Sequence, residues 1–190
     1  MRPIAQQKST TLGANHIQKI AIVGPESTGK TTLASQLAQA LHTVWIPEYA
    51  REFLEQLGRP YVREDLIDIA KGQLALENQG LPQANKWLIC DTNLLVIKIW
   101  EEFRYGAQHP DIGERMNLST FALYILTKTD IPWTADDQRE SPDLAERQEL
   151  FSLYEQALLQ AGVSYITVSG TPDMRLDRAL RAIGELGNGE

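Results

Sequence analysis

The segment Gly24–Thr31, GPESTGKT, has the types and spacing of a phosphate-binding loop, because it satisfies the pattern GxxxxGK followed by Ser or Thr. Its glycines allow successive backbone N–H groups to point at an anion, and a following helix adds its positive end. In this pattern Lys30 reaches the β- and γ-phosphates of a nucleoside triphosphate, while the hydroxyl of Thr31 binds Mg²⁺. The sequence therefore predicts a site for Mg-ATP. The expected contact residues are Gly24, Glu26, Ser27, Thr28, Gly29, Lys30, Thr31 and Thr32.

The loop lies between an apolar run and a helical pattern, which is the context that such a loop requires. Residues 20–23 predict a buried strand, and residues 32–41 show apolar side chains at helical spacing. Further apolar runs predict strands at 44–46, 87–90, 121–126 and 164–168. Helical patterns are found at 48–57, 63–77, 93–105, 144–160 and 173–186. Strands that alternate with helices favour parallel pairing, so the expected fold is α/β: a three-layer α/β/α P-loop NTPase with a five-stranded parallel sheet.

Polar residues follow several of the predicted strands. Near the carboxyl ends of these strands fall Gly24, Glu48, Asp91, Asp130 and Ser169. In parallel sheets covered by helices, ligands bind beyond these ends. We therefore expect these residues to share one site.

The composition is that of a soluble globular chain of 190 residues, and it limits the classes of partner. The formal net charge of −7 argues against nucleic-acid binding, which requires a basic face. Cys90 is the only cysteine, which excludes an intramolecular disulfide and favours a reducing, cytoplasmic location. No apolar run approaches the length of a membrane span, and the first residues lack the apolar core of a signal peptide. We expect a flexible tail over residues 1–17 and a single domain over 18–190, while nothing in the sequence indicates an oligomeric state.

Four segments of the sequence, the first of which contains the loop, carry a further signal: Gly24–Leu33 (GPESTGKTTL), Glu48–Phe53 (EYAREF), Cys90–Asn93 (CDTN) and Asp130–Arg139 (DIPWTADDQR). Together they resemble the nicotinamide riboside kinase domain of the bifunctional bacterial NadR proteins. The resemblance spans about residues 19–170 and implies a fold like that of nucleoside and nucleotide kinases, with a lid. It also implies ATP-dependent phosphorylation of a nucleoside 5′-hydroxyl, here the conversion of nicotinamide riboside to nicotinamide mononucleotide. The family often carries a nucleotidyltransferase domain with an HxGH signature, which this sequence lacks, so we expect the kinase part alone.

Two carboxylates are candidates for the catalytic base. Glu48 follows the second strand, where related nucleoside kinases place the carboxylate that accepts the 5′-hydroxyl proton; its other possible role is to favour the macrodipole of the next helix. Asp91 ends the third strand, where an acidic group can hold Mg²⁺, act as the base, or cap the following helix. Arg51 lies one helical turn after Glu48 and either contacts the substrate or pairs with Glu55. The sequence leaves these alternatives open.

The loop over residues 130–147 resembles a lid. Its arginines, Arg139 and Arg147, could close over the phosphates and neutralise charge in the transition state. Arg139 is the better candidate because it falls within a segment that resembles the family. After the fifth strand, Ser169 and Gly170 stand where P-loop kinases wrap adenine with backbone groups, although a simple turn would look the same.

A cationic pyridinium ring favours an aromatic face, so aromatic residues are candidates to stack on nicotinamide. These candidates are Trp133, Tyr49 and Tyr105, each of which could instead be a packing residue. Asp136 and Asp137 could balance the positive charge of the substrate.

Three other functions deserve comparison with the kinase. The run Thr127–Asp130, TKTD, mimics the guanine reader TKxD of regulatory GTPases, but Asp91–Leu94 reads DTNL where a GTPase needs DxxG. A kinase for another nucleoside or for a nucleotide would share the loop and the lid. A regulatory module that binds ATP without chemistry would share the loop alone.

Overall fold

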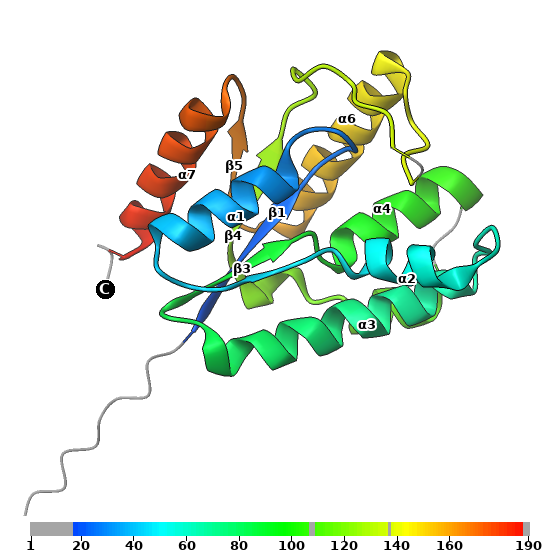
Figure 1. Cartoon of the computed structure of the whole chain (residues 1–190), viewed down its shortest axis with the longest axis horizontal. Helices are drawn as coiled ribbons and strands as arrows, with labels where there is room; N and C mark the ends of the chain where they lie inside the picture. The colour runs from blue at the N-terminus through cyan, green and yellow to red at the C-terminus, as the bar shows by residue number, and fades with distance from the viewer. Residues whose placement is uncertain (1–16, 107–108, 137, 188–190) are drawn as a thin grey trace, which may run out of the picture.

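The computed structural model describes residues 17–106, 109–136 and 138–187, and it contains a twisted sheet with helices on both faces (Figure 1). Its strands are β1 (Gln18–Val23), β2 (Trp45–Ile46), β3 (Trp87–Asp91), β4 (Phe121–Thr127) and β5 (Tyr165–Val168). They pair in the order β2-β3-β1-β4-β5, and every pair is parallel. The expected three-layer α/β/α fold with a five-stranded parallel sheet is therefore confirmed.

The helices pack on the sheet in two layers. The helices are α1 (Lys30–Ala40), α2 (Tyr49–Leu57), α3 (Asp65–Gly80), α4 (Leu94–Tyr105), α5 (Pro110–Arg115), α6 (Leu144–Ala161) and α7 (Pro172–Gly187). Helices α1 and α7 cover one face, where Ile20 and Ile22 of β1 point, while α4 and α6 cover the face of Ala21 and Val23. Because both faces are covered, β1 reads as a continuous apolar run rather than an alternating one.

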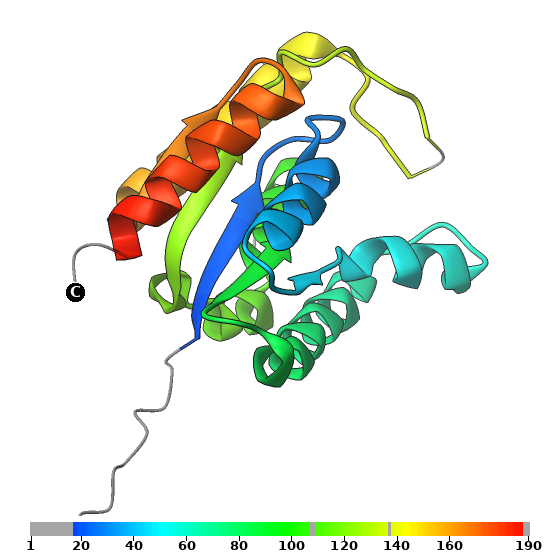
Figure 2. The ribbon, with the colours of Figure 1, turned by 60° about the vertical axis from the view of Figure 1, so that its left-hand side comes forward.

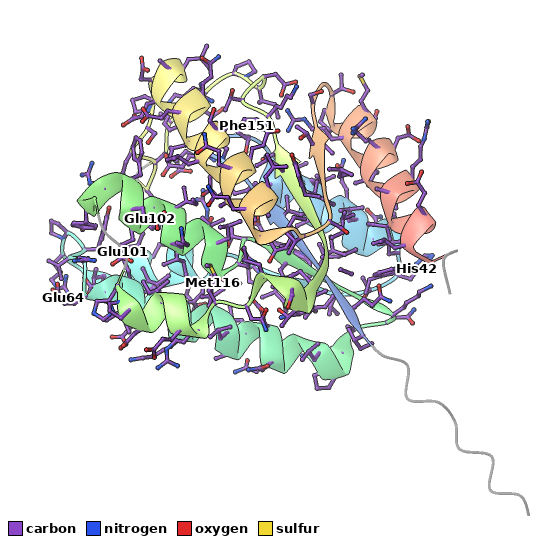
Figure 3. All side chains as sticks on the ribbon, turned by 180° about the vertical axis from the view of Figure 1, so that it is seen from behind. His42, Glu64, Glu101, Glu102, Met116 and Phe151 are labelled. Carbon is purple, nitrogen blue, oxygen red and sulfur yellow. The ribbon has the colours of Figure 1, made fainter. Side chains whose placement is uncertain are left out.

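The predicted helices and strands all occur, with ends that differ by no more than three residues. The sequence reading missed α5 and two short 3-10 helices, η1 (Leu81–Gln83) and η2 (Leu118–Thr120). These elements are too short to show a periodic pattern, although Pro110 at the first turn of α5 is a helix-start signal. Glu101 of α4, labelled in Figure 3, is buried and accepts hydrogen bonds from Arg63 Nε (2.8 Å) and the His109 backbone N–H (2.7 Å), which fixes the start of α5.

The segment between β4 and α6 projects beyond the carboxyl ends of the strands, on the same side as α2 (Figure 2). This segment contains the predicted lid. None of the described helices is long and apolar enough to cross a membrane. Most of the predicted tail, residues 1–16, lies outside the described residues.

Candidate active site

The cradle, Gly24–Thr31, connects β1 to α1 and is anchored on the neighbouring strand β4. Gly24 adopts φ 137°, and a Cβ atom there would lie 2.5 Å from Thr127 Oγ1. The hydroxyl of Thr28 lies 2.7 Å from the same oxygen and donates to Pro25 O at 2.7 Å. Only glycine allows the chain to pass this close to β4, so the first position of the motif has a steric cause. Helix α1 begins at Lys30, which places its positive end at the cradle.

Lys30 curls back over the cradle. Its Nζ atom donates hydrogen bonds to Gly24 O at 3.0 Å and Pro25 O at 2.9 Å. These acceptors are neutral carbonyl groups, and a phosphate oxygen would make a stronger, charge-assisted hydrogen bond. The lysine is thus held at the mouth of the cradle by partners that an anion can replace.

Asp91, at the end of β3, is a buried carboxylate without a full set of partners. It is 1% exposed, and its Oδ1 atom has no hydrogen-bond partner among the described residues. Burial, and then the charge of Glu48, raises the pKa of Asp91 to about 6, while the Thr31 hydroxyl, Lys30 and Arg51 act in the opposite direction. An unpartnered carboxylate oxygen beside the hydroxyl of Thr31 fits a divalent cation.

A magnesium ion at this place would need few protein ligands. Among the described residues there is no group of three or more His, Cys, Asp and Glu side chains that could hold a metal alone. Mg²⁺ in phosphoryl-transfer sites is bound through one or two protein oxygens and the phosphates of the nucleotide. The pair Thr31 and Asp91 meets this requirement.

Glu48 directly precedes α2 and faces the cavity beyond the cradle. Its side chain makes no capping hydrogen bond to the helix. It pairs instead with Arg51 Nε, 3.4 Å away, while Arg51 Nη1 lies 3.3 Å from Asp136 Oδ2. Arg51 therefore pairs with Glu48 and Asp136, and not with Glu55, the partner that the sequence suggested. The two base candidates, Glu48 and Asp91, lie close enough for the charge of one to raise the pKa of the other.

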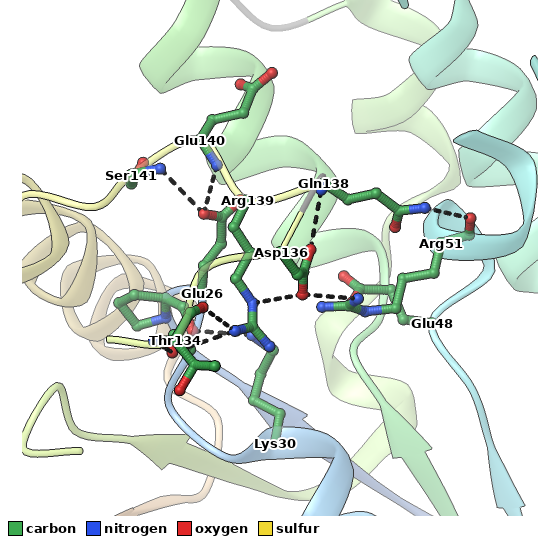
Figure 4. Close-up of polar contacts among 12 residues, drawn as sticks. Glu26, Lys30, Glu48, Arg51, Thr134, Asp136, Gln138, Arg139, Glu140 and Ser141 are labelled. Carbon is green, nitrogen blue, oxygen red and sulfur yellow. Dashed lines mark hydrogen bonds and ion pairs between the residues drawn. The ribbon is translucent and has the colours of Figure 1, made fainter. Parts of the chain in front are cut away.

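The lid is tied to the cradle by the side chains of Glu26 and Ser27, and the contacts of Glu26 are drawn in Figure 4. Glu26 Oε2 accepts hydrogen bonds from the backbone N–H groups of Glu140 (2.9 Å) and Ser141 (3.1 Å). Ser27 Oγ accepts from the backbone N–H of Thr134 at 3.0 Å. These contacts place the lid over the phosphate-binding loop, as the sequence predicted for this segment.

Asp136 joins the lid to α2, as Figure 4 shows. Its Oδ2 atom lies 2.9 Å from Arg139 Nε and 3.3 Å from Arg51 Nη1. Burial acts to raise the pKa of Asp136, but the Gln138 N–H and the two guanidinium groups outweigh it and lower this pKa. Asp136 thus holds one arginine from each side of the cavity. Its neighbour Asp137 lies outside the described residues.

Trp133 contacts the arginines of the lid. The guanidinium carbon of Arg147 lies 5.2 Å from the centre of the indole, and that of Arg139 lies 5.9 Å from it. Arg147 is 4% exposed, and its Nε and Nη1 atoms have no hydrogen-bond partner among the described residues. Trp133 is not among the residues that line the cavity, and its ring contacts two arginines of the chain.

The cavity continues from the cradle to an aromatic wall that sequence reasoning missed. The wall is formed by Trp100 and Phe103 of α4 and Tyr154 of α6. The available signal was the helical spacing of Val96, Trp100 and Phe103 in a helix that starts just after Asp91. These side chains therefore share one face of α4, the face that borders the cavity.

The other two aromatic candidates lie elsewhere. Tyr49 packs on Phe53, with ring centres 6.1 Å apart, and covers Gly72 of α3, where a Cβ atom would meet its ring at 1.9 Å. Tyr105 lines a neighbouring hollow rather than the cavity. Neither Tyr49 nor Tyr105 lines the cavity that contains Glu48.

Asp130, the last residue of the GTPase-like run, is fully engaged by the chain itself. Its Oδ2 atom accepts a hydrogen bond from the Gly170 N–H at 2.6 Å, and its Oδ1 atom pairs with Arg175. An aspartate that binds guanine needs free carboxylate oxygens for the base. The contacts of Asp130 therefore argue against the interpretation of this protein as a GTPase. Ser169 lines a hollow beside α7, outside the cavity of the cradle.

The fold and the cradle define a P-loop nucleotide-binding protein. The chain belongs to the AAA domain family, whose model matches residues 19–175. It is 27% identical over 175 residues to the trifunctional NAD biosynthesis/regulator protein NadR of Escherichia coli (strain K12), an alignment that covers 90% of this chain and 43% of NadR. The chain thus spans less than half the length of this relative. The resemblance to NadR that the four segments indicated is confirmed.

Solved structures share the fold. A crystal structure of NadR in complex with NR superposes with a TM-score of 0.71 at 20% identity, covering 90% of this chain and 50% of NadR. A NadR complex with NAD and AMP-PNP gives 0.70 at 18% identity, with coverages of 90% and 49%. Deoxyadenosine kinase from M. mycoides gives 0.57 at 16% identity, with coverages of 89% and 100%. The architecture is therefore that of P-loop nucleoside kinases.

Proposed function

We propose that this protein transfers the γ-phosphate of Mg-ATP to the 5′-hydroxyl of a nucleoside, and that its acceptor is nicotinamide riboside. The observation that carries the proposal is a single cavity that joins the cradle, Glu48 and an aromatic wall. A phosphate donor and a nucleoside would lie end to end in such a cavity. The likeness to NadR, which has been crystallised with NR and with AMP-PNP, supports both ligands.

The donor half of the site holds the triphosphate. The N–H groups of the cradle and the Nζ atom of Lys30 would bind the phosphate oxygens, and Thr31 and Asp91 would hold Mg²⁺. When bound, this ion neutralises negative charge on the β- and γ-phosphates. Arg139 lies in the lid beside Ser27, with 3.5 Å between its Nη1 atom and the serine Oγ, so it can add positive charge at the transferred group.

Glu48 is the proposed base. It faces the cavity, and Arg51 orients its carboxylate, whereas Asp91 is buried beside the hydroxyl of Thr31. As the nucleoside 5′-oxygen forms its bond to the γ-phosphorus, Glu48 takes the hydroxyl proton. The bond from the γ-phosphorus to the bridging oxygen breaks, and ADP leaves with that electron pair.

The acceptor half suits a flat, positively charged ring. Trp100 and Phe103 offer aromatic surface, and Glu146 also lines the cavity, whereas the carboxylate of Glu140 lies 3.8 Å from Arg104. Aromatic faces and nearby negative charge both stabilise a cation, and nicotinamide riboside carries one on its pyridinium ring. We therefore assign the stacking role to the α4 aromatics, because the Trp133 ring already carries the lid arginines.

Incubation with Mg-ATP and a panel of nucleosides, followed by mass spectrometry of the products, tests the proposal. Nicotinamide riboside should gain one phosphate faster than thymidine, deoxyadenosine or cytidine. If it stays unchanged while another nucleoside is phosphorylated, the acceptor assignment is wrong and the kinase assignment stands. If no nucleoside is phosphorylated, the kinase assignment is wrong as well.

Substitution of Glu48 tests its role as the base separately. Glu48→Gln should lower kcat by about a hundredfold or more, since a positioned base contributes at least this much. The affinity for AMP-PNP should stay close to that of the wild type. Glu52→Gln, an exposed glutamate of the same helix, is the control. A kcat for Glu48→Gln near that of the control would remove the base role from this residue.

A further inference from the structure

Arg175 of α7 is a buried arginine that neither lines the cavity nor belongs to any motif of the sequence. It is 2% exposed, and it is among the largest fully buried side chains of the described residues. A guanidinium group keeps its charge in a protein, so burial requires several good partners. The identity of these partners indicates what the residue does.

The guanidinium group of Arg175 joins three segments that meet at the carboxyl edge of the sheet. Its Nη1 atom donates to Thr28 O in the cradle at 2.7 Å, and its Nε atom donates to Gly170 O at 2.9 Å. Its Nη2 atom donates to Lys128 O at 3.4 Å and also pairs with the Asp130 carboxylate. One side chain thus connects the cradle, the end of β4 and the turn after β5.

The hydrogen bond to Thr28 O controls a donor of the cradle. A trans peptide unit is planar, so the carbonyl of Thr28 and the N–H of Gly29 point in opposite directions. Because Arg175 holds the carbonyl on the side of α7, the Gly29 N–H is directed away from α7. Gly29 adopts φ 78°, a left-handed conformation that this restraint helps to maintain. A cationic donor also polarises the peptide unit, which makes its N–H a stronger donor to an anion.

Asp130 supplies the counter-charge. One of its oxygens pairs with Arg175 and the other accepts the Gly170 N–H, so the carboxylate also holds the turn after β5 against the end of β4. The run Thr127–Asp130 therefore has a role without a guanine base. Within this run, Lys128 O and the Asp130 carboxylate bind the guanidinium group of Arg175 behind the cradle.

We infer that Arg175 is a positioning residue for the donor nucleotide: it sets the direction of the Gly29 N–H and locks the turn at Gly170 to the cradle. The inference rests on the proposed function only in that the donor is a nucleoside triphosphate. Arg175 raises the affinity for the donor nucleotide. The position of Glu48 and the binding of the nucleoside do not depend on Arg175. None of its hydrogen bonds reaches Glu48, Arg51 or the aromatic wall.

The test compares Arg175→Lys with Arg178→Lys, an exposed arginine one turn further along α7. Lysine keeps the charge but cannot hold three separate carbonyl groups with a planar fork. For Arg175→Lys, we expect the Kd of Mg-AMP-PNP and the KM of ATP to rise about tenfold. The KM of the nucleoside and kcat should stay within about twofold of the wild type. Arg178→Lys should match the wild type throughout.

Folding of each variant is checked by its urea unfolding curve. A folded Arg175→Lys protein that binds Mg-AMP-PNP as tightly as the wild type overturns the inference, as does an equal rise in both KM values. If this variant fails to fold, Asp130→Asn replaces it, because asparagine removes the counter-charge and leaves the carbonyl partners. Asp130→Asn should raise the Kd about threefold, and an unchanged Kd again overturns the inference.

The two proposals fail in different ways. Binding of AMP-PNP needs no acceptor, so it reports on Arg175 even if no nucleoside is phosphorylated. A wild-type protein that binds AMP-PNP but modifies no nucleoside refutes the proposed kinase and leaves the role of Arg175 in place. A wild-type protein that does not bind AMP-PNP overturns both.

Discussion

Replacing Asp91 with asparagine should make the ligand-free protein more stable at neutral pH, although it removes a group that the proposed reaction uses. Burial, followed by the charge of Glu48, raises the pKa of Asp91 from the usual 3.8 to about 6. The folded chain therefore binds this proton more tightly than the unfolded chain does. The resulting stabilisation is fully present below 3.8 and is lost as the pH rises through about 6.

The magnitude follows from the two pKa values. A difference of one unit between the folded and unfolded pKa values corresponds to about 1.4 kcal/mol. Complete ionisation of Asp91 therefore lowers the free energy of unfolding by about 3 kcal/mol. About 1.4 kcal/mol of this loss falls between about pH 5 and about pH 8. Asparagine does not ionise, so the free energy of unfolding of the variant should not fall by this amount over the same pH range.

The assay is urea unfolding of both proteins at about pH 5 and about pH 8, in EDTA and without nucleotide. Burial also raises the pKa values of Glu26 and Glu77, but both proteins contain these groups and their effects cancel. The stability of Asp91→Asn relative to the wild type should increase by about 1.4 kcal/mol from the lower to the higher pH. A relative stability that is constant with pH, or that decreases, would refute the reasoning.

Three further changes test the cradle and the lid. Lys30→Ala should weaken the binding of Mg-AMP-PNP, measured by calorimetry, by about a hundredfold, because a charge-assisted contact is lost; an unchanged Kd would remove the lysine from the site. Trp133→Leu should raise the KM of ATP about tenfold by releasing both lid arginines, whereas Trp133→Phe should restore most of the affinity; equal effects of the two variants would contradict the cation–π contact. Gly24→Ala should destabilise the protein by about 2 kcal/mol or more in urea unfolding, since its φ is positive and its Cβ would meet Thr127. Gly58→Ala has a positive φ but no neighbour within 4 Å, so a cost equal to that of Gly24→Ala would show that the close contact is irrelevant.

The fold could be predicted because each strand contains an apolar run and because apolar side chains recur at helical spacing in the long helices. The cradle was predictable for a different reason, since its geometry depends on glycines and on a fixed spacing of neighbouring residues. Both signals are local in the sequence. The short helix α5 has only six residues and lacks the periodicity that reveals longer helices.

The contacts of the lid could not be predicted, because they join residues that are far apart in the chain. Arg51 was expected to pair with Glu55 or to contact the substrate, but the fold brings it to Glu48 and to Asp136, which is 85 residues away. Trp133 looked like a surface for the substrate, yet two arginines lie against it. Trp100 was overlooked, since an aromatic residue in an apolar helix is usually a packing residue. Such outcomes depend on tertiary packing, which a single sequence does not reveal.

The attachment of the lid to Glu26 has a consequence for how this protein can vary. The lid contributes only main-chain N–H groups to this contact, so the side chains at positions 140 and 141 are not needed for it. Related sequences can therefore differ at positions 140 and 141 and still make this contact in the same place, provided that the second residue after Gly24 remains an acid.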